Sequence, residues 1–360
     1  MTTGGEIENF WAVVPAGGAG TRLWPLSRAG EPKFLKDLRG SGRTLIQETF
    51  DRLRPLASER FLVVTGASHA AAVGRQLDEL TTDRILAEPS ARDSMAAIGL
   101  AAALLEREDP DAVMGSFAAD HVIPDQDVFA EAVATAVAVA REDWLVTLGI
   151  EPTFPSSAFG YVQSGEALAG HAGASTVAAF VEKPSVETAT AYLEAGGYRW
   201  NAGMFVVRPR VLLDLLGQFH PEFAAALRGI AAAPETLEEV WPTLPKIALD
   251  HAIAEPAAAV GRVATVPASF SWDDVGDFDS LATLLAGEEP VTVLGDAGRV
   301  LGVDATGLVV PGERTVAVIG LEDVVVVDTP DAVLVTSRAR AQDVKKIVAA
   351  LKDGGRVDLT

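Results

Sequence analysis

The sequence of 360 residues contains no cysteine. Disulfide bonds, thiolate nucleophiles and metal sites built from cysteine are therefore excluded. Positive charge is also scarce, because 29 lysine and arginine residues stand against 50 aspartate and glutamate residues, which gives a net charge of −21. A surface of this charge repels phosphate backbones, so we expect neither nucleic acid nor an anionic membrane as a partner.

Long hydrophobic runs are missing as well. No uncharged apolar run approaches the roughly 20 residues that a membrane-spanning helix needs. Residues 1–9 lack the basic start of a signal peptide, so we expect a cytoplasmic protein. Hydrophobic residues nevertheless make up 49% of the chain, which is enough for a proper core.

Short β-rich runs alternate with alanine-rich helical patterns in the first half of the chain. Strands are predicted over 10–14, 61–65, 84–87, 112–117 and 144–149, and helices over 44–56, 68–80, 93–108 and 127–141. This order predicts an α/β fold with a Rossmann-like, mainly parallel sheet and helices on both faces. Ligands then bind beyond the carboxyl ends of the strands.

The pattern changes twice further along. After Gly149, loops containing proline and glycine alternate with predicted strands over 177–182, 203–207 and 262–266. After Pro290, short valine-rich runs over 299–303, 307–310, 315–319 and 323–327 predict stacked short strands, closed by a helix over 341–351. We therefore predict a domain of residues 1–290 and a small domain of residues 291–360.

A glycine-rich loop follows the first predicted strand and contains Ala16, Gly17, Gly18, Ala19, Gly20, Thr21 and Arg22. Glycines let the backbone N–H groups face a phosphate. The loop lacks the Gly-Lys-Ser/Thr end of a P-loop and the third glycine of a dinucleotide-binding loop. Arg22 and Lys33 can supply two cations to a triphosphate. The glycines alone fit a tight connection from strand to helix equally well.

Two aspartates are candidate ligands of one metal ion. Asp120 follows the strand predicted over 112–117, and Asp274 lies in the segment Trp272-Asp273-Asp274-Val275-Gly276. Magnesium prefers carboxylate and phosphate oxygens and usually takes only one or two protein carboxylates. Taken singly, an aspartate at such a position is more often a helix cap or a turn former.

Another group of residues suits a sugar phosphate. Lys183 can hold the phosphate, while Glu182 and Asn201 can hydrogen-bond to hydroxyl groups, and Gly160 lets the backbone approach the sugar ring. The pair of Glu182 and Lys183 alone would also fit an ordinary exposed ion pair.

Glu88 is a candidate for recognition of the base. Its carboxylate can accept hydrogen bonds from N1–H and from the exocyclic amine of guanine, whereas adenine presents an acceptor at N1. An unpaired buried acceptor costs about 1–3 kcal/mol, so one residue can supply a preference for GTP. The alternative is that Glu88 caps the helix that starts near Asp93.

The motifs, in this order, resemble the sugar-1-phosphate nucleotidyltransferase family, and in particular its mannose-1-phosphate guanylyltransferase (GDP-mannose pyrophosphorylase) branch. In that family the glycine-rich loop with its arginine and lysine binds nucleotide phosphates, Ala-Asp-His and Trp-x-Asp-Val-Gly bind metal, and Glu-Lys-Pro and Trp-Asn-x-Gly-Met-Phe bind the sugar phosphate. The resemblance implies catalytic roles for Arg22, Lys33, Asp120 and Asp274, the last two as metal ligands. It implies nucleotide binding by Ala16, Gly17, Gly18, Gly20, Thr21, Arg22, Lys33, Glu88 and Asp120, and sugar-phosphate binding by Gly160, Glu182, Lys183 and Asn201.

The resemblance also implies an activity. GMP would pass from GTP to α-D-mannose 1-phosphate by Mg²⁺-dependent in-line displacement, giving GDP-mannose and diphosphate. The implied fold is a GT-A-like nucleotidyltransferase domain followed by a short left-handed β-helix-like domain, which often takes part in dimer contacts, so a homodimer is possible. Only about nine residues follow Leu351, so we expect no isomerase domain.

The sequence departs from the motifs of the branch at two places. The branch usually reads Glu-Pro-x-x-Arg-Asn-Thr-Ala-Pro-Ala where this chain has Asp93-Ser94-Met95-Ala96 after Arg92, and it tends to read Ser-x-Asp-Tyr-Ala where this chain keeps Asp250 but has His251. Another sugar 1-phosphate, such as that of glucose or a heptose, therefore stays open. A non-catalytic subunit that senses nucleotide sugars is the alternative of another class.

Overall fold

The computed structural model describes residues 5–18 and 20–360, which form two compact units. Unit 1 comprises the described residues of Met1–Gly17, Phe50–Ala119 and Ile123–Trp272, and unit 2 comprises the described residues of Gly18–Thr49, Asp120–Val122 and Asp273–Thr360. This division differs from the predicted domains, because unit 2 combines the C-terminal residues with two segments from the first third of the chain. The boundary near Pro290 stays a prediction.

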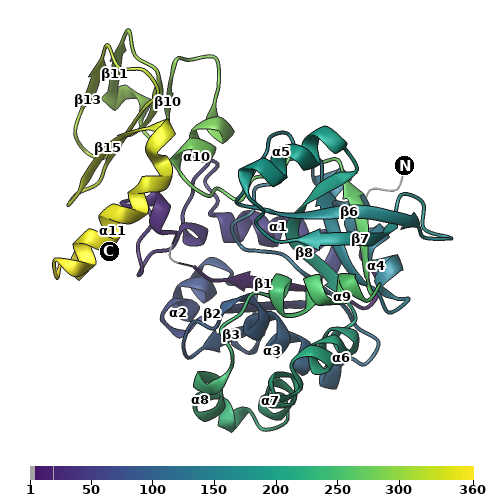
Figure 1. Cartoon of the computed structure of the whole chain (residues 1–360). Helices are drawn as coiled ribbons and strands as arrows, with labels where there is room; N and C mark the ends of the chain where they lie inside the picture. Colours follow the sequence, from purple (N-terminus) through teal and green to yellow (C-terminus); the bar gives the residue numbers. More distant parts are fainter. Residues whose placement is uncertain (1–4, 19) are drawn as a thin grey trace. The chain divides into compact units, whose positions relative to one another are not determined.

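The described residues of unit 1 contain a nine-stranded mixed sheet (Figure 1). Its strands, in spatial order, are β3 (Ile85–Glu88), β2 (Phe61–Gly66), β1 (Phe10–Ala16), β4 (Val113–Ser116), β8 (Tyr198–Val207), β5 (Leu145–Ile150), β9 (Val263–Ala268), β7 (Ser175–Val181) and β6 (Gly160–Ala167). The first four are parallel to one another, and β5 is parallel to β9. The antiparallel pairings all involve β6, β7 or β8. The predicted parallel order therefore describes one half of the sheet, and the other half is mixed.

Helices cover the sheet of unit 1 because alternate side chains of each strand point to opposite faces. Trp11 and Val13 of β1 belong to a core cluster with residues of three helices, which lie together in Figure 1: α3 (Asp93–Glu108), α6 (Pro209–Phe219) and α7 (Pro221–Ala232). Phe10 alternates with them and packs edge-to-face on Phe117, which in turn contacts Phe129 of α4 (Gln126–Ala140). The sheet is thus buried on both faces, as its apolar strands require.

The helices α6 and α7 and the strand β6 correct the prediction of loops after Gly149. Pro209 and Pro221 look like helix breakers in the sequence, but each stands in the first turn of its helix. Proline is tolerated there, because the first N–H groups of a helix have no partner within it. The other α-helices among the described residues are α1 (Leu45–Ala57), α2 (Ala67–Gln76), α5 (Val186–Ala195), α8 (Leu237–Val240), α9 (Glu255–Ala259), α10 (Phe278–Leu285) and α11 (Val344–Asp353).

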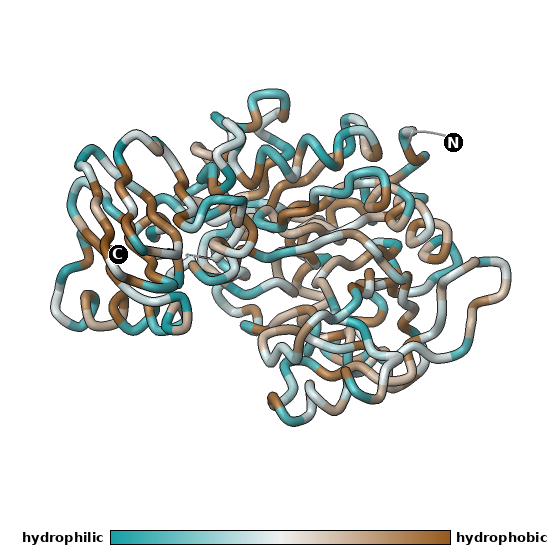
Figure 2. Tube along the Cα trace, turned by 90° about the horizontal axis from the view of Figure 1, so that it is seen from above, coloured by the Kyte–Doolittle hydropathy of each residue, from teal (hydrophilic) through white to brown (hydrophobic). Residues whose placement is uncertain are grey.

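Unit 2 contains the stacked valine-rich strands. They form two sheets, one of β10 (Val291–Val293), β12 (Gly307–Val310), β14 (Val324–Asp328) and β15 (Val333–Ser337), and the other of β11 (Val300–Val303) and β13 (Val316–Ile319). Val324 and Val326 of β14 pack against Val318 of β13, whereas Val325 and Val327 of the same strand join the core cluster with α10 and α11. Because β14 is buried on both faces, it is apolar along nearly its whole length. Figure 2 shows this hydrophobic character along the strands.

The described part of the chain contains no helix with both the length and the apolar composition for crossing a bilayer.

Gly307 tests the packing of the stacked strands. Its φ is +132°, and a Cβ atom there would lie 1.9 Å from the backbone oxygen of Val324. We expect Gly307→Ala to lower the free energy of unfolding by at least about 1–3 kcal/mol, because backbone atoms cannot yield as a flexible side chain can. Denaturant unfolding measures this. Gly287→Ala is the control, since nothing lies within 4 Å of its added Cβ; equal stability of both variants would contradict the packing described.

Candidate functional site

The predicted site residues lie in two groups, one in each unit. Those in unit 2 are Gly18, Gly20, Thr21, Arg22, Lys33, Asp120 and Asp274. Those in unit 1 are Ala16, Gly17, Glu88, Gly160, Glu182, Lys183 and Asn201. Ala19 of the glycine-rich loop lies outside the described residues. Each group is described within its own unit, and the meeting of the two groups at one reaction centre stays a prediction.

The glycine-rich loop needs glycine at two positions for conformation. Gly18 and Gly20 have φ values of 89° and 55°, in the left-handed region that residues with a side chain rarely adopt. Gly20 also lacks room for a side chain, because an added Cβ would lie 2.6 Å from Oγ of Ser27 and 3.3 Å from the side chain of Lys33. Glycine at position 20 thus lets the turn that carries Arg22 (Thr21–Leu23) approach Lys33 closely.

A short antiparallel bridge brings the two aspartate segments of unit 2 together. The backbone N–H of Val122 donates to the oxygen of Asp273 at 2.9 Å, and the N–H of Asp273 donates back at 3.1 Å. Antiparallel pairing at this point sets Asp120 beside the residues that follow Asp273, although the segments lie far apart in the sequence.

Lys33 ties both aspartate segments to one position. Its Nζ lies 3.0 Å from Oδ2 of Asp120 and donates to the backbone oxygens of Asp274 at 2.6 Å and Val275 at 3.2 Å. A lysine has three N–H donors, and all three are used here. The side chains of Lys33 and Asp120 are only 12% and 19% exposed, so solvent screens this ion pair weakly.

The neighbouring aspartates have different surroundings. Oδ1 of Asp273 accepts hydrogen bonds from the N–H of Val275 at 2.6 Å and from Oγ of Ser280 at 2.8 Å, so this carboxylate holds the turn. Val275 has φ of 45° there, which is rare for a β-branched residue and marks a strained turn. An added Cβ on Gly276 would lie 3.2 Å from Oδ1 of Asp274 and 3.6 Å from Nη1 of Arg22. Asp274 and Arg22 therefore border the same small space.

The pKa values of Asp120 and Asp274 are shifted in opposite directions. Burial acts to raise the pKa of Asp120, but the charges of Lys33 and His121 outweigh it and hold the pKa below its ordinary value. Burial raises the pKa of Asp274, against the influence of Lys33 and His121 and with the help of the neighbouring acids. A divalent cation would relieve the cost of ionising both carboxylates in one place.

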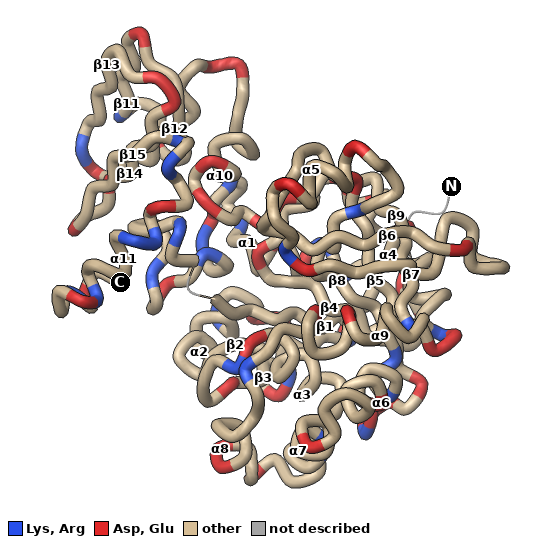
Figure 3. The backbone as a smooth tube through the Cα atoms, in the orientation of Figure 1, with Lys and Arg blue, Asp and Glu red and all other residues tan. Residues whose placement is uncertain are grey.

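The donor set fits magnesium with open positions. Among residues 5–18 and 20–360, no group of three or more acidic or histidine side chains is arranged to hold a metal ion. Two carboxylates are nevertheless what Mg²⁺ usually takes from a protein when water and substrate phosphates complete its shell. Figure 3 shows acidic and basic residues spread over both units.

The sugar-phosphate residues of unit 1 pack around a buried glutamate. An added Cβ on Gly160 would lie 2.4 Å from Oε2 of Glu182, so glycine at this position makes room for the carboxylate. Glu182 is 7% exposed by its side chain and pairs with Nζ of Lys183 at 2.9 Å, while Lys183 is 62% exposed. The pair is thus one buried acid and one accessible cation. The backbone of Lys183 has φ of 47°, which is rare outside glycine.

Asn201 uses most of its hydrogen-bonding capacity inside the protein. Its Oδ1 accepts from Oγ1 of Thr147 at 2.7 Å and from the N–H of Gly203 at 3.2 Å, and its Nδ2 donates to Oδ1 of Asp250 at 2.6 Å. One N–H of the amide remains. Asn201 is therefore placed to orient Asp250 as well as to meet a ligand.

Asp250 is a functional candidate that the analysis of the sequence did not include among the site residues. Burial and the nearby charge of Glu182 raise the pKa of Asp250 to about 6, while the bond from Asn201 and the charge of Lys183 act against them. A buried carboxyl that ionises near neutral pH can accept hydrogen bonds from a sugar hydroxyl. The signal in the sequence was its retention in an otherwise altered motif.

Glu88 ends β3 and is partly buried. Burial raises the pKa of Glu88 to about 7. The alternative role as a helix cap is wrong, because α3 has Arg92 as its N-cap residue and no side chain makes the cap hydrogen bond. The carboxylate of Asp93 accepts from the N–H of Ser94 at 2.9 Å instead.

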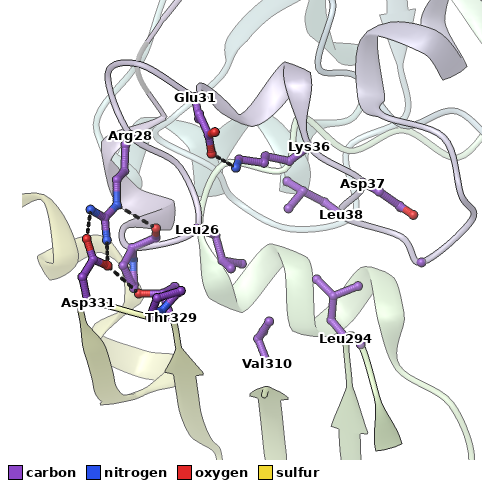
Figure 4. A pocket seen from close by; sticks show the side chains of 14 residues that line it. Leu26, Arg28, Glu31, Lys36, Asp37, Leu38, Leu294, Val310, Thr329 and Asp331 are labelled. Atoms are coloured by element: carbon purple, nitrogen blue, oxygen red, sulfur yellow. Dashed lines mark hydrogen bonds and ion pairs between the residues drawn. The ribbon is translucent and has the colours of Figure 1, made fainter. Parts of the chain in front are cut away.

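A cavity of about 680 Å³ lies in unit 2 but contains none of the predicted site residues. Its apolar lining includes Leu26, Leu38, Leu294, Val310 and Pro330. Figure 4 shows two ion pairs in its lining, Arg28 with Asp331 and Lys36 with Glu31.

The chain is similar to known proteins over nearly its whole length. Residues 11–289 match the family model "Nucleotidyl transferase", and residues 298–351 match "MannoseP isomerase/GMP-like beta-helix domain". The chain is 37% identical to the xanthan biosynthesis protein XanB of Xanthomonas campestris pv. campestris, covering 98% of this chain and 76% of that protein. It is 38% identical to a mannose-1-phosphate guanylyltransferase of Escherichia coli, covering 97% and 75%.

A solved structure from Thermus thermophilus, described as a mannose-1-phosphate geranyltransferase, superposes with a TM-score of 0.87 at 34% identity and covers 96% of this chain and 99% of its own. The predicted fold class, a nucleotidyltransferase domain followed by a β-helix domain, is thereby confirmed. The chain belongs to the nucleotidyl transferase family.

Proposed function

We propose that the protein transfers GMP from GTP to α-D-mannose 1-phosphate and releases diphosphate. The observation that carries the proposal is the cluster of Lys33, Asp120 and Asp274, with Arg22 beside it, in a chain that otherwise repels anions. The relatives named mannose-1-phosphate guanylyltransferase, at up to 38% identity over nearly the whole chain, support the choice of substrates.

The chemistry is an in-line displacement at the α-phosphorus of GTP. An oxygen of the sugar phosphate forms the new P–O bond, and the bond to the oxygen that bridges the α- and β-phosphorus breaks, so that diphosphate leaves with the electron pair. The attacking phosphate is already ionised at neutral pH and needs no general base. Mg²⁺, held by Asp120 and Asp274, would neutralise charge on the phosphates.

Residues of the chain then position the two anions. Arg22 and Lys33 offer positive charge to the departing diphosphate, and the glycine-rich loop offers backbone N–H groups. Lys183, which is exposed, offers a point charge to the sugar phosphate. The buried acids Glu182 and Asp250 offer acceptors to the sugar hydroxyls, so that catalysis consists of positioning and charge stabilisation.

The proposal includes a homodimer. Leu301 and Val303 of β11 and Ile319 of β13 carry exposed apolar side chains on neighbouring strands. An apolar strip of this kind suits contact with a second copy.

A panel of nucleotides and sugar phosphates, followed by release of diphosphate, tests the proposal. We expect GTP with mannose 1-phosphate to give the highest kcat/KM. A higher value with glucose 1-phosphate or a heptose 1-phosphate would identify a different sugar substrate. Binding of GDP-mannose without any turnover would support the sensor and overturn the enzyme.

The metal ligands are tested by Asp120→Asn and Asp274→Asn. Each keeps the shape of the side chain but removes the charge that holds Mg²⁺. We expect kcat to fall at least about 100-fold and the Mg²⁺ concentration for half-maximal rate to rise, since a bound metal contributes several kcal/mol of charge stabilisation. Asp127→Asn, at an exposed position at the start of α4, is the control. Normal turnover in either ligand variant would end the assignment of the metal.

Recognition of guanine is tested by Glu88→Gln. The amide can accept only through one oxygen, so one donor of guanine loses its partner and kcat/KM for GTP should fall about tenfold. ITP lacks the exocyclic amine, and its kcat/KM should fall less. Exposed Glu59→Gln is the matched control. Equal losses with GTP, ITP and ATP would show that Glu88 does not contact the base.

The raised pKa of Glu88 predicts a pH dependence of GTP affinity. Burial puts this pKa at about 7 in the free protein, and guanine donors favour the ionised carboxylate. Affinity should therefore increase as pH rises through 7, by up to about tenfold per unit below the pKa, and level off above it. Calorimetry at saturating Mg²⁺, with Glu88→Gln as reference for titration of the nucleotide, measures the difference. Parallel pH profiles in both proteins would contradict the role.

A further inference from the structure

A segment of unit 1, residues 241–249, runs beside the loop that follows Glu88, and we call this segment the strap. The indole N–H of Trp241, which is fully buried, donates to the oxygen of Ser90 at 2.7 Å. The N–H of Met95 donates to the oxygen of Ile247 at 3.2 Å. The strap is therefore fixed to the loop at its beginning and to the first turn of α3 near its end.

Arg92 fixes the middle of the strap. Its guanidinium donates to the backbone oxygens of Pro242 and Leu244, the latter at 3.2 Å. Two bonds from one planar group to two carbonyl oxygens hold both the position and the orientation of a backbone. Arg92 therefore serves the strap, although it lies close in sequence to the residue proposed to bind the base.

The last bond of the strap adjoins the sugar-side cluster. The N–H of Leu249 donates to Oγ of Ser94 at 2.9 Å, and Leu249 is fully buried. The next residue is Asp250, which begins a π-helix (Asp250–Ala254) and receives the 2.6 Å hydrogen bond from Asn201. Such wide turns occur often at functional sites. One hydroxyl in the first turn of α3 thus fixes the backbone N–H directly before the buried acid Asp250.

We propose that Ser94 is a positioning residue for the sugar phosphate, acting through the strap on Asp250; this inference rests on the proposed function. Without the hydroxyl, the buried N–H of Leu249 has no acceptor and the backbone must move to find one. A movement of the backbone at Leu249 also shifts the next residue, Asp250. The 2.6 Å hydrogen bond from Asn201 to Asp250 then changes its length or direction. Binding of mannose 1-phosphate then weakens although the substitution lies on the nucleotide side.

The electrostatics of unit 1 agree with this connection. Burial acts to lower the pKa of Lys183, whereas the charges of Asp250 and Asp93 act to raise it. The start of α3 and the sugar-side cluster are therefore close enough to interact. Threonine, which the family motif carries at the position of Ser94, would provide the same hydroxyl. The conservative change Ser94→Thr therefore belongs in the test.

The test compares Ser94→Ala, Ser94→Thr and the control Thr135→Ala, which removes a hydroxyl bonded to Glu131 on an exposed face of α4. KM for mannose 1-phosphate and KM for GTP are measured separately, each with the other substrate saturating. We expect Ser94→Ala to raise KM for mannose 1-phosphate about three- to tenfold, the loss of one buried hydrogen bond, with KM for GTP changed less than about twofold. Ser94→Thr should keep KM for mannose 1-phosphate at the wild-type value, because the hydroxyl is retained. Thr135→Ala should leave both KM values unchanged.

Other outcomes decide against the proposal. An increase confined to KM for GTP would make Ser94 a nucleotide residue. Equal changes for both substrates, with a lower midpoint of thermal unfolding, would make the strap a purely structural element. The two proposals fail separately: a wild-type protein that makes no GDP-mannose overturns the proposed function, whereas an active wild type with an unchanged KM for mannose 1-phosphate in Ser94→Ala overturns the strap.

Discussion

The contact of Lys33 with Asp120 and with the backbone of Asp274 and Val275 is the constraint on which the rest of unit 2 depends. A chain with a net charge of −21 has few cations to place beside buried acids. Without Lys33, two carboxylates in a poorly solvated corner would repel each other, and ionising both would cost more free energy. With it, the segments are held together before any ligand arrives. The metal ion and triphosphate of the proposed function would then meet a site that is already arranged, and arrangement in advance lowers the cost of bringing anions together.

In unit 1 as well, buried acids are stabilised by one lysine and by hydrogen bonds. Glu182 and Asp250 are buried near each other, and the single lysine beside them, Lys183, is mostly exposed. Asn201, itself held by Thr147, offers a hydrogen bond in place of a second cation. Lys183 pairs with Glu182 but remains exposed, so in the proposed function it can still reach a phosphate. Acceptors for hydroxyls and a cation for a phosphate are what a sugar 1-phosphate requires of a protein.

The sequence predicted most of what depends on local pattern and little of what depends on long-range contact. The helix expected over 93–108 is α3 to the residue, because an alanine-rich segment between two strands has little choice of structure. The helices that begin at Pro209 and Pro221 were missed, since proline marks a helix start as well as a break. The tie between Lys33 and the turn at Val275 joins residues more than 200 positions apart, and no spacing rule reaches so far. The motif Trp-x-Asp-Val-Gly already favours Asp274 over Asp273 as the metal ligand, and the structure adds that the carboxylate of Asp273 holds its own turn.

The two departures from the family motifs illustrate the same limit. In the sequence they are two separate mismatches with the family motifs, one after Arg92 and one around Asp250. In the structure they lie on segments that are bonded to each other, and the groups that make or adjoin those bonds are the ones retained: the guanidinium of Arg92, a hydroxyl at Ser94 and the carboxylate of Asp250. His251 is exposed and bonds to Glu255, whose other oxygen accepts from the N–H of Glu182. A changed ring there alters the outside of the cluster while the acceptors inside keep their positions. The departures are therefore weak evidence against the proposed sugar site. Each lies in a segment whose position is still held by hydrogen bonds from retained groups.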